Sequence, residues 1–256
     1  MNLAAHGKRV LITAGAAGIG YVIARTFREA GARVHICDID KEALSRAKPE
    51  LADQSLADVA KLGDVDRLFH DVERSLGGLD VLVNNAGIAG PTAKVEDIAP
   101  EDWERCIAVD LTGMFYCTRK AMPMIKAAGG GSIINLSSAA GRHGFPHRTP
   151  YAAAKWGVVG FTKSLAVEAG PEKVRVNCLL PGIVEGERIE RVIAAKAKAH
   201  GVSQEEFRQR FLETTSLRST VSPQDIANMA LYLCSPFGAT ISGQALAVDG
   251  DMQSLV

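Results

Sequence analysis

The sequence predicts an α/β fold in which helices cover both faces of a mostly parallel sheet. Short runs rich in Val, Ile and Leu alternate along the 256 residues with longer stretches of helical periodicity. Strands that are apolar almost throughout are typical of a parallel sheet, because both of its faces pack against helices. Right-handed crossovers between such strands produce a doubly wound sheet. Because no repeat, low-complexity stretch or linker interrupts the chain, we expect a single domain over residues 1–256.

Seven strands are expected, and five of them are strongly apolar. These five are Val10–Thr13, Val34–Cys37, Leu79–Val83, Ser132–Leu136 and Val174–Leu180. The weaker candidates are Ser55–Val59 and Ala245–Val248. Most segments between the strands have apolar residues at the spacing of a helix that buries one face. The predicted helices are Ile19–Ala30, Val65–Leu76, Glu101–Ala127, Tyr151–Glu168 and Pro223–Cys234.

Residues 185–218 depart from the alternation of strands and helices. This segment is highly charged, and we expect two helical pieces separated near His200–Ser203. It follows Pro181-Gly182 at the end of a predicted strand, where α/β enzymes place the elements that cover a substrate. We therefore predict a helical substrate lid; a solvated pair of helices is the alternative.

Charge and composition exclude several classes of protein. Lys plus Arg equals Asp plus Glu at 29 each, so no global field attracts nucleic acid or an anionic membrane. The N-terminal residues lead directly into a strand without a secretory signal, and no apolar segment is long enough to span a bilayer. The five cysteines are far apart and include no C-x-x-C pair. We therefore expect free thiols, no metal site and a cytoplasmic location.

A glycine-rich turn over residues 13–20, Thr-Ala-Gly-Ala-Ala-Gly-Ile-Gly, joins the first predicted strand to the first predicted helix. Glycine lets a backbone turn sharply and approach a pyrophosphate without a Cβ in the way. The helix N-terminus then presents free N–H groups to the phosphates. This context predicts a dinucleotide site, with a tight strand–helix connection as the alternative. The expected contacts are Gly15, Ala17, Gly18, Ile19 and Gly20.

Asp38 closes the second predicted strand, 18 residues after Gly20. A carboxylate at this place accepts hydrogen bonds from both ribose hydroxyls of an adenosine and repels a 2′-phosphate. No basic residue immediately follows it, so the sequence predicts NAD rather than NADP as the cofactor. The alternative role for Asp38 is that of an acid that caps a loop.

Ser138, Tyr151 and Lys155 form a candidate site for hydride-transfer chemistry. Tyr151 and Lys155 are four residues apart on one face of a predicted helix, and Ser138 follows a predicted strand. A phenol titrates near pH 10, so it needs help to act as a base at neutral pH. A nearby ammonium stabilises the phenolate and lowers that pKa. A serine hydroxyl holds the substrate oxygen in place.

Taken in order, these motifs resemble those of the short-chain dehydrogenase/reductase family over nearly the whole chain. The residues that carry the resemblance are the turn 13–20, Asn84-Asn85-Ala86-Gly87, Ser138, Tyr151-x-x-x-Lys155 and Pro181-Gly182. The resemblance implies a Rossmann-type domain and a homotetramer built partly through the helices of residues 101–127 and 151–168. It also implies that Ser138 orients the substrate oxygen, Tyr151 is the acid/base, and Lys155 binds the nicotinamide ribose.

The resemblance adds further cofactor contacts to those of the turn. By position they are Asp58, Val59, Asn85, Ala86, Gly87, Pro181, Gly182 and Val184. Three positions depart from the family pattern. Ala14 replaces the first glycine of the turn, and Gly186 replaces a threonine. Asp110 replaces an asparagine that holds a water in a proton relay, which adds a charge to that relay.

Arg148 suggests the chemistry of the substrate. It lies three residues before Tyr151, where the similar 3-hydroxybutyrate dehydrogenases have a lysine that binds the substrate carboxylate. A guanidinium grips such a group with two hydrogen bonds. We therefore expect a small polar hydroxy compound, such as a hydroxy acid or a sugar derivative, and Arg148 favours an anionic one. An ion pair of Arg148 at a surface or subunit interface is the alternative.

Two other functions fit parts of the sequence. One is a 3-oxoacyl carrier-protein-type ketoreductase, which favours NADPH and a basic docking patch; Asp38 and the zero net charge argue against both. The other is a non-catalytic dinucleotide sensor. A sensor does not need Ser138, Tyr151 and Lys155 together, so the sequence disfavours it.

Overall fold

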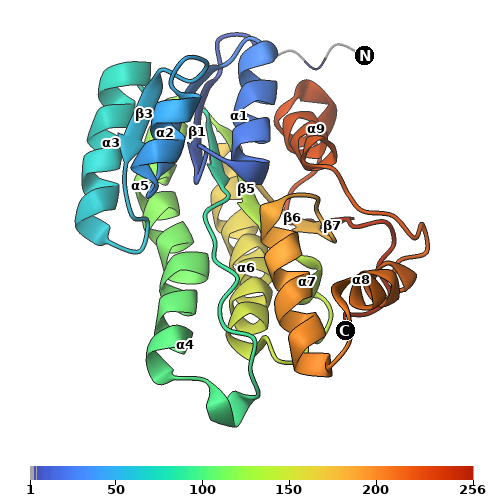
Figure 1. The fold of residues 1–256 in the computed structure, drawn as a ribbon. Helices are drawn as coiled ribbons and strands as arrows, with labels where there is room; N and C mark the ends of the chain where they lie inside the picture. Colours follow the sequence, from blue (N-terminus) through green and yellow to red (C-terminus); the bar gives the residue numbers. More distant parts are fainter. Residues whose placement is uncertain (1–2, 4, 256) are drawn as a thin grey trace.

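A seven-stranded parallel sheet forms the centre of the molecule, in a computed structural model that describes residues 3 and 5–255 (Figure 1). Its strand order is β3-β2-β1-β4-β5-β6-β7, and every neighbouring pair is parallel. The order reverses direction between β1 and β4, which is the arrangement of a doubly wound sheet. The strands are β1 (Arg9–Thr13), β2 (Arg33–Asp38), β3 (Asp53–Leu56), β4 (Val81–Asn84), β5 (Gly131–Leu136), β6 (Val174–Pro181) and β7 (Ala245–Val248).

The two faces of the sheet bury separate apolar clusters. Successive side chains of a strand point to opposite faces, so Val10 and Ile12 of β1 enter one cluster and Leu11 enters the other. Helices α1 (Gly18–Glu29), α2 (Lys41–Ala47) and α9 (Pro223–Cys234) cover the first face. Helices α3 (Leu62–Leu76), α5 (Gly113–Ala127) and α6 (Thr149–Ala169) contribute to the second. The fold class predicted from the sequence is confirmed.

One predicted helix is divided. Residues 101–127 form α4 (Pro100–Ile107), a π-helical turn (Ala108–Thr112) and α5 rather than a regular α-helix. A π-turn inserts one extra residue and is frequent at functional sites. Here it lies between the two helices and contains Asp110, so it sets the direction of that side chain.

The helix α2 is absent from the predicted set because its seven residues are too few for a periodic pattern. It begins at Asp40, whose carboxylate accepts hydrogen bonds from the N–H groups of Glu42 and Ala43. This cap places α2 directly after Asp38.

Two helices form in residues 185–218, separated where the sequence predicts. They are α7 (Glu187–His200) and α8 (Gln204–Glu213), and in the view of Figure 1 they lie below β6 and β7. Gly201 ends α7 in the left-handed conformation, and the Ser203 side chain caps α8. We call α7 and α8 together the helical cover. Gly186, which precedes α7, has φ 133°, a conformation that glycine adopts and threonine avoids.

The structure tests the expectation of free thiols. All five cysteines are free. Among the described residues, no helix is both long and apolar enough to cross a membrane.

Candidate active site

A cavity of about 590 Å³ lies at the carboxyl ends of β1, β4, β5 and β6, beneath α7. In a doubly wound sheet this edge is where ligands bind. Of the residues predicted for the site, the structure brings most to this cavity. Those that line it are Ala17, Gly18, Ile19, Asp38, Asn85, Gly87, Ser138, Arg148, Tyr151, Lys155, Pro181, Gly182 and Val184.

Five predicted cofactor residues do not line the cavity: Gly15, Gly20, Asp58, Val59 and Ala86. The two glycines allow close packing of the turn. A Cβ on Gly15 would lie 2.7 Å from Ile36, and one on Gly20 would lie 2.1 Å from the carbonyl oxygen of Ala14.

Asp58 is not a lining residue, and its carboxylate has partners outside the cavity. Its carboxylate accepts a hydrogen bond from the N–H of Ala60 and forms an ion pair with Arg105 at 3.2 Å. Val59 packs instead against α5, where its oxygen would be 3.0 Å from a Cβ on Gly113. The Asp58 side chain therefore positions the loop after β3, and any contact of this loop with a cofactor remains a prediction.

The turn after β1 leaves the first N–H groups of α1 without a side-chain cap. Ala17 is the N-cap residue and has no oxygen to offer them. These N–H groups and the positive end of the helix dipole face the cavity at Ala17, Gly18 and Ile19. The turn therefore has the donor set of an anion site.

Asn85 ties the end of β4 to this turn. Its Nδ2 donates to the carbonyl oxygens of Thr13 and Ala14, each at 3.0 Å. The N–H groups of Asn85 and Ala86 donate to the Thr13 hydroxyl. The motif after β4 therefore fixes the shape of the glycine-rich turn as well as lining the cavity.

Asp38 lies at the end of β2, where it lines the cavity and also organises the backbone. Its two oxygens accept hydrogen bonds from the N–H groups of Ala16 and Asp40. Arg46 of α2 lines the same cavity and was not predicted as a site residue. Its position depends on α2, the helix missing from the sequence prediction.

Lys155 is buried beside Tyr151. Its ammonium donates to the Leu136 carbonyl oxygen at 3.1 Å and lies 5.4 Å from the centre of the Tyr151 ring. The amine is also 3.3 Å from the carboxylate of Asp110, and both side chains are almost fully buried. A buried ammonium needs such hydrogen-bond and charge partners, because burying an unpaired charge is costly.

Asp110 is held on both sides. One carboxylate oxygen accepts a hydrogen bond from the N–H of Ile88 at 2.7 Å, and the other faces Lys155. Asp110 stands where the family pattern has an asparagine. The substitution therefore places a buried carboxylate next to Lys155, a candidate catalytic residue.

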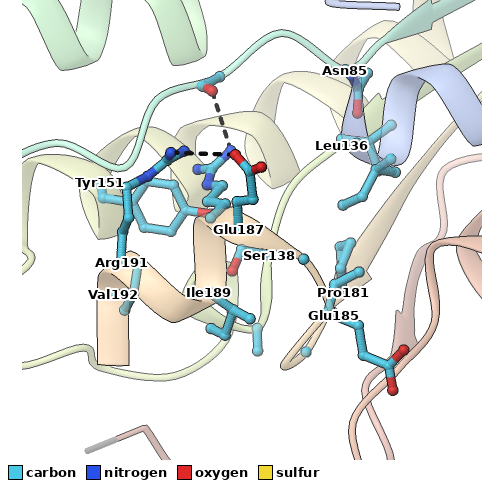
Figure 2. Close-up of a pocket in the computed structure, with 18 of the residues that line it drawn as sticks. Asn85, Leu136, Ser138, Tyr151, Pro181, Glu185, Glu187, Ile189, Arg191 and Val192 are labelled. Atoms are coloured by element: carbon cyan, nitrogen blue, oxygen red, sulfur yellow. Dashed lines mark hydrogen bonds and ion pairs between the residues drawn. The ribbon is translucent and has the colours of Figure 1, made fainter. Parts of the chain in front are cut away.

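Ser138 and Tyr151 line the same cavity and are drawn together in Figure 2. Ser138 is the N-cap of a short 3-10 turn, and its oxygen accepts a hydrogen bond from the N–H of Ala140 at 3.2 Å. Its hydroxyl proton stays available to a ligand oxygen. The neighbouring Ser137 instead donates to the backbone of Lys155, so it joins β5 to α6.

Arg148 is buried next to Tyr151. Its guanidinium donates to the Ala89 carbonyl oxygen and lies 5.3 Å from the centre of the Tyr151 ring and 5.2 Å from that of Phe145. Burial lowers the pKa of Arg148. The surface ion pair offered as an alternative role is not present among the described residues, since the side chain is only 2% exposed.

A second arginine, Arg188 of α7, was not predicted as a site residue. Its guanidinium carbon lies 5.7 Å from the centre of the Tyr151 ring, and Nη1 donates to the Gly87 carbonyl oxygen at 3.2 Å. In the sequence Arg188 is one of many charges in the helical cover, and no local pattern distinguishes it.

Known proteins resemble the chain along its full length. A family model described as "Enoyl-(Acyl carrier protein) reductase" matches residues 14–253. The 3-oxoacyl-[acyl-carrier-protein] reductase FabG of Chlamydia muridarum is 35% identical, over 98% of this chain and 100% of its own. The D-beta-hydroxybutyrate dehydrogenase of Rhizobium meliloti is 34% identical, over 95% and 97%.

Solved structures agree with the fold. The 7 alpha-hydroxysteroid dehydrogenase complexed with NADH and 7-oxo glycochenodeoxycholic acid has a TM-score of 0.90 and 32% identity, covering 100% of this chain and 98% of its own. NAD+-bound xylitol dehydrogenase has a TM-score of 0.92 and 26% identity, covering 96% and 98%. From the motifs, the site and these similarities together, the chain belongs to the short-chain dehydrogenase/reductase family of oxidoreductases.

Proposed function

We propose that this protein is an NAD-dependent dehydrogenase that interconverts a secondary alcohol and a ketone on a small, polar, anionic substrate. One observation carries the proposal. Tyr151, the buried Lys155 and Ser138 line the same cavity as the uncapped N-terminus of α1. A proton donor and a dinucleotide-binding turn are both required for reversible transfer of a hydride to a carbonyl carbon.

The residues of the cavity fit a dinucleotide. Gly18 has φ 54°, and a Cβ added to it would meet no atom within 4 Å, so the turn leaves open space where phosphates need a close approach. The N–H groups at the start of α1 would hold the pyrophosphate, and Asp38 the adenosine ribose. Lys155 and Gly87 would border the nicotinamide ribose. When bound, NAD supplies the acceptor or donor of the hydride.

The protein's own residues manage the proton. Tyr151 Oη takes a proton from the substrate hydroxyl during oxidation and returns it to the carbonyl oxygen during reduction. Lys155 stabilises the phenolate by Coulomb attraction. The Ser138 hydroxyl donates to the same substrate oxygen and fixes its orientation. Asp110 and the Leu136 carbonyl oxygen hold Lys155 in place.

The choice of NAD rests on Asp38. Similar structures include both an NAD+-bound dehydrogenase and a polyketide ketoreductase with NADPH, so family membership leaves both cofactors open. A carboxylate at the ribose repels a 2′-phosphate. Arg46 is the cation that would favour NADP, and its guanidinium faces Glu42 at 4.0 Å.

We further propose that the helical cover is the substrate lid and that the protein is a cytoplasmic homotetramer. Ile189, Arg191 and Val192 of α7 line the cavity, as a lid requires. Trp103, Phe115 and Trp156 are large apolar side chains left exposed on α4, α5 and α6, the helices expected at the subunit interface. Free cysteines are consistent with a reducing compartment.

The similarity to FabG supports a second candidate, reduction of carrier-bound 3-oxoacyl chains with NADPH. The two functions differ in both cofactor and substrate, so one experiment separates them. Purified protein is assayed with hydroxy acids, polyols, sugars and 3-oxoacyl thioesters, each with NAD(H) and NADP(H). NAD-linked turnover of a hydroxy compound is expected. NADPH-linked reduction of the thioester alone would replace the proposal with the ketoreductase.

Substitution tests the catalytic assignment. Tyr151→Phe is expected to lower kcat by at least about 100-fold, since it removes the general acid/base but keeps the ring. Binding of NADH, followed by its fluorescence, should persist in the variant. Undiminished turnover by Tyr151→Phe would contradict the assignment.

A further inference from the structure

We propose that a second chamber beside the catalytic cavity is an anion subsite, in which Arg148 and Arg188 hold a carboxylate, sulfonate or phosphate group of the substrate. The inference deepens the proposed function and rests on it. It names the chemical group that the substrate carries and a lid residue that recognises it. The chamber has a volume of about 420 Å³.

The chamber is lined by cations and apolar groups. It is lined by residues 87–90 and Thr92, by Arg148, and by residues of α7 that include Arg188 and Arg191. No Asp or Glu of residues 3 and 5–255 lines it. Arg148 and Arg188 are among the residues that line both this chamber and the catalytic cavity, so the two spaces adjoin.

Arg148 is an incompletely paired buried cation. Its side chain is 2% exposed, its Nε has no hydrogen-bond partner, and its one hydrogen bond in the described residues goes to the Ala89 carbonyl oxygen. No described carboxylate forms an ion pair with it. Because an uncompensated buried charge is costly, such a group is retained where a ligand supplies the opposite charge.

Arg188 adds a second cation from α7, where its residue is exposed to solvent. Its hydrogen bond goes to the neutral Gly87 carbonyl oxygen, and no described carboxylate pairs with it. By contrast, the third cation, Arg191, faces Glu187 at 3.8 Å. Arg188 and Arg148 lie close enough that the charge of Arg188 helps to lower the pKa of Arg148. An anion between them would relieve this repulsion.

The geometry limits the size of the substrate. The guanidinium carbons of Arg148 and Arg188 lie 5.3 and 5.7 Å from the centre of the same Tyr151 ring. An oxyanion held by both is therefore only a short chain away from a carbinol group at the phenol oxygen. This spacing fits a small hydroxy acid or its sulfonate or phosphate analogue, and not the middle of a long acyl chain.

The test compares charged and neutral forms of one molecule. Rates are measured with short hydroxy acids, with their sulfonate and phosphate analogues, and with the matching neutral amides. The wild-type protein is expected to prefer the anionic members. Arg188→Met should lower the ratio of kcat/KM for acid over amide by about 10- to 100-fold, mainly through KM, as for loss of a charged hydrogen bond.

Arg208→Met is the matched control. Arg208 is also a cover arginine, but it pairs with Glu190 and lines neither space. This variant should leave the acid-to-amide ratio unchanged. Equal turnover of acids and amides by the wild type, or equal loss for both in Arg188→Met, would overturn the inference while leaving the dehydrogenase intact. A raised KM for NAD alone would assign Arg188 to the cofactor.

A binding measurement keeps the inference testable without turnover. Acetate, sulfate and inorganic phosphate are titrated calorimetrically into wild-type protein, Arg188→Met and Arg208→Met. Binding that is present in the wild type and in Arg208→Met but weakened in Arg188→Met supports the subsite. Equal binding by all three proteins, or none, contradicts it, whatever the outcome of the NAD assays.

Discussion

At the scale of single residues, this protein departs from the family pattern in the charges that surround Lys155. Asp110 brings a carboxylate to 3.3 Å from the buried amine, where the family pattern has a neutral amide. The carboxylate fixes the position of the ammonium but offsets part of its charge. Less of the Lys155 field therefore reaches the Tyr151 phenolate.

Asp110→Asn tests this balance. An asparagine oxygen can still accept the hydrogen bond from the Ile88 N–H, so the fold should be kept. Removing the negative charge should strengthen the stabilisation of the phenolate by Lys155. We expect kcat for alcohol oxidation, measured at saturating substrate and NAD, to rise several-fold. A kcat identical to that of the wild type would show that Asp110 does not tune the site.

A second residue-scale prediction concerns Ala14, which has φ 49°. The left-handed conformation costs an alanine about 1 kcal/mol, whereas glycine adopts it freely. Ala14→Gly should therefore raise the free energy of unfolding by about 0.5 kcal/mol after the larger chain entropy of glycine is subtracted. Urea denaturation measures the change.

The control for Ala14 is Ala153→Gly, at an exposed position inside α6. There glycine should destabilise by about 1 kcal/mol. If glycine changed the free energy of unfolding in the same direction at both positions, the argument from the left-handed conformation of Ala14 would be wrong.

At the scale of elements, the helical cover is attached to the molecule by its own small apolar cluster. Ile193, Phe207 and Phe211 pack with Ile183 of the segment after β6 and with Met252 near the C-terminus. This cluster is separate from the two that flank the sheet. The cover therefore has the means to open without unfolding the sheet.

Phe207→Ala tests this independence. Its ring is 2% exposed and lies 5.9 Å from that of Phe211 and 5.5 Å from that of His200, measured between centres. Truncation should weaken local packing by about 3 kcal/mol. We expect faster hydrogen exchange in α7 and α8 and a higher KM, with sheet amides unchanged.

Arg210→Ala, at an exposed position of α8, is the control for Phe207. It should leave the exchange rates of α7 and α8 as they are. If Phe207→Ala instead speeds exchange throughout the sheet, the cover and the sheet unfold as one unit.

At the scale of the whole molecule, a buried histidine makes stability depend on pH. His35 of β2 lies between the hydroxyls of Ser55 and Ser75, at 2.9 and 2.8 Å. Burial lowers the pKa of His35 from 6.5 to about 4. The unfolded chain therefore takes up a proton between these pH values while the folded protein does not.

Because the folded pKa is the lower one, the stability due to neutral His35 is complete above pH 6.5 and is lost as pH falls toward 4. The loss amounts to up to about 3 kcal/mol. Urea midpoints should fall over this range in the wild type. The fall should be smaller in His35→Gln, which keeps a donor and an acceptor without a titrating ring. An equal fall in both proteins would rule out His35 as the source.

The sequence by itself determined the sheet and the positions of the catalytic candidates. Short apolar strands and the four-residue spacing of Tyr151 and Lys155 are local patterns, and burial of apolar side chains selects them when the chain folds. Ser138, Tyr151 and Lys155 could be identified because each follows a strand or shares a helix face. In parallel strands these places meet at one edge.

Only the tertiary structure decided which charges face the cavity. Packing between segments far apart in the chain determines three features of the site. The π-turn directs Asp110 toward Lys155, and the short α2 carries Arg46. Among the arginines of the helical cover, packing places Arg188 beside Tyr151. The position of a charged residue in the sequence does not determine which residue it pairs with. The reason is physical: burial and distance set the strength of an electrostatic interaction, and both exist only once the chain has folded.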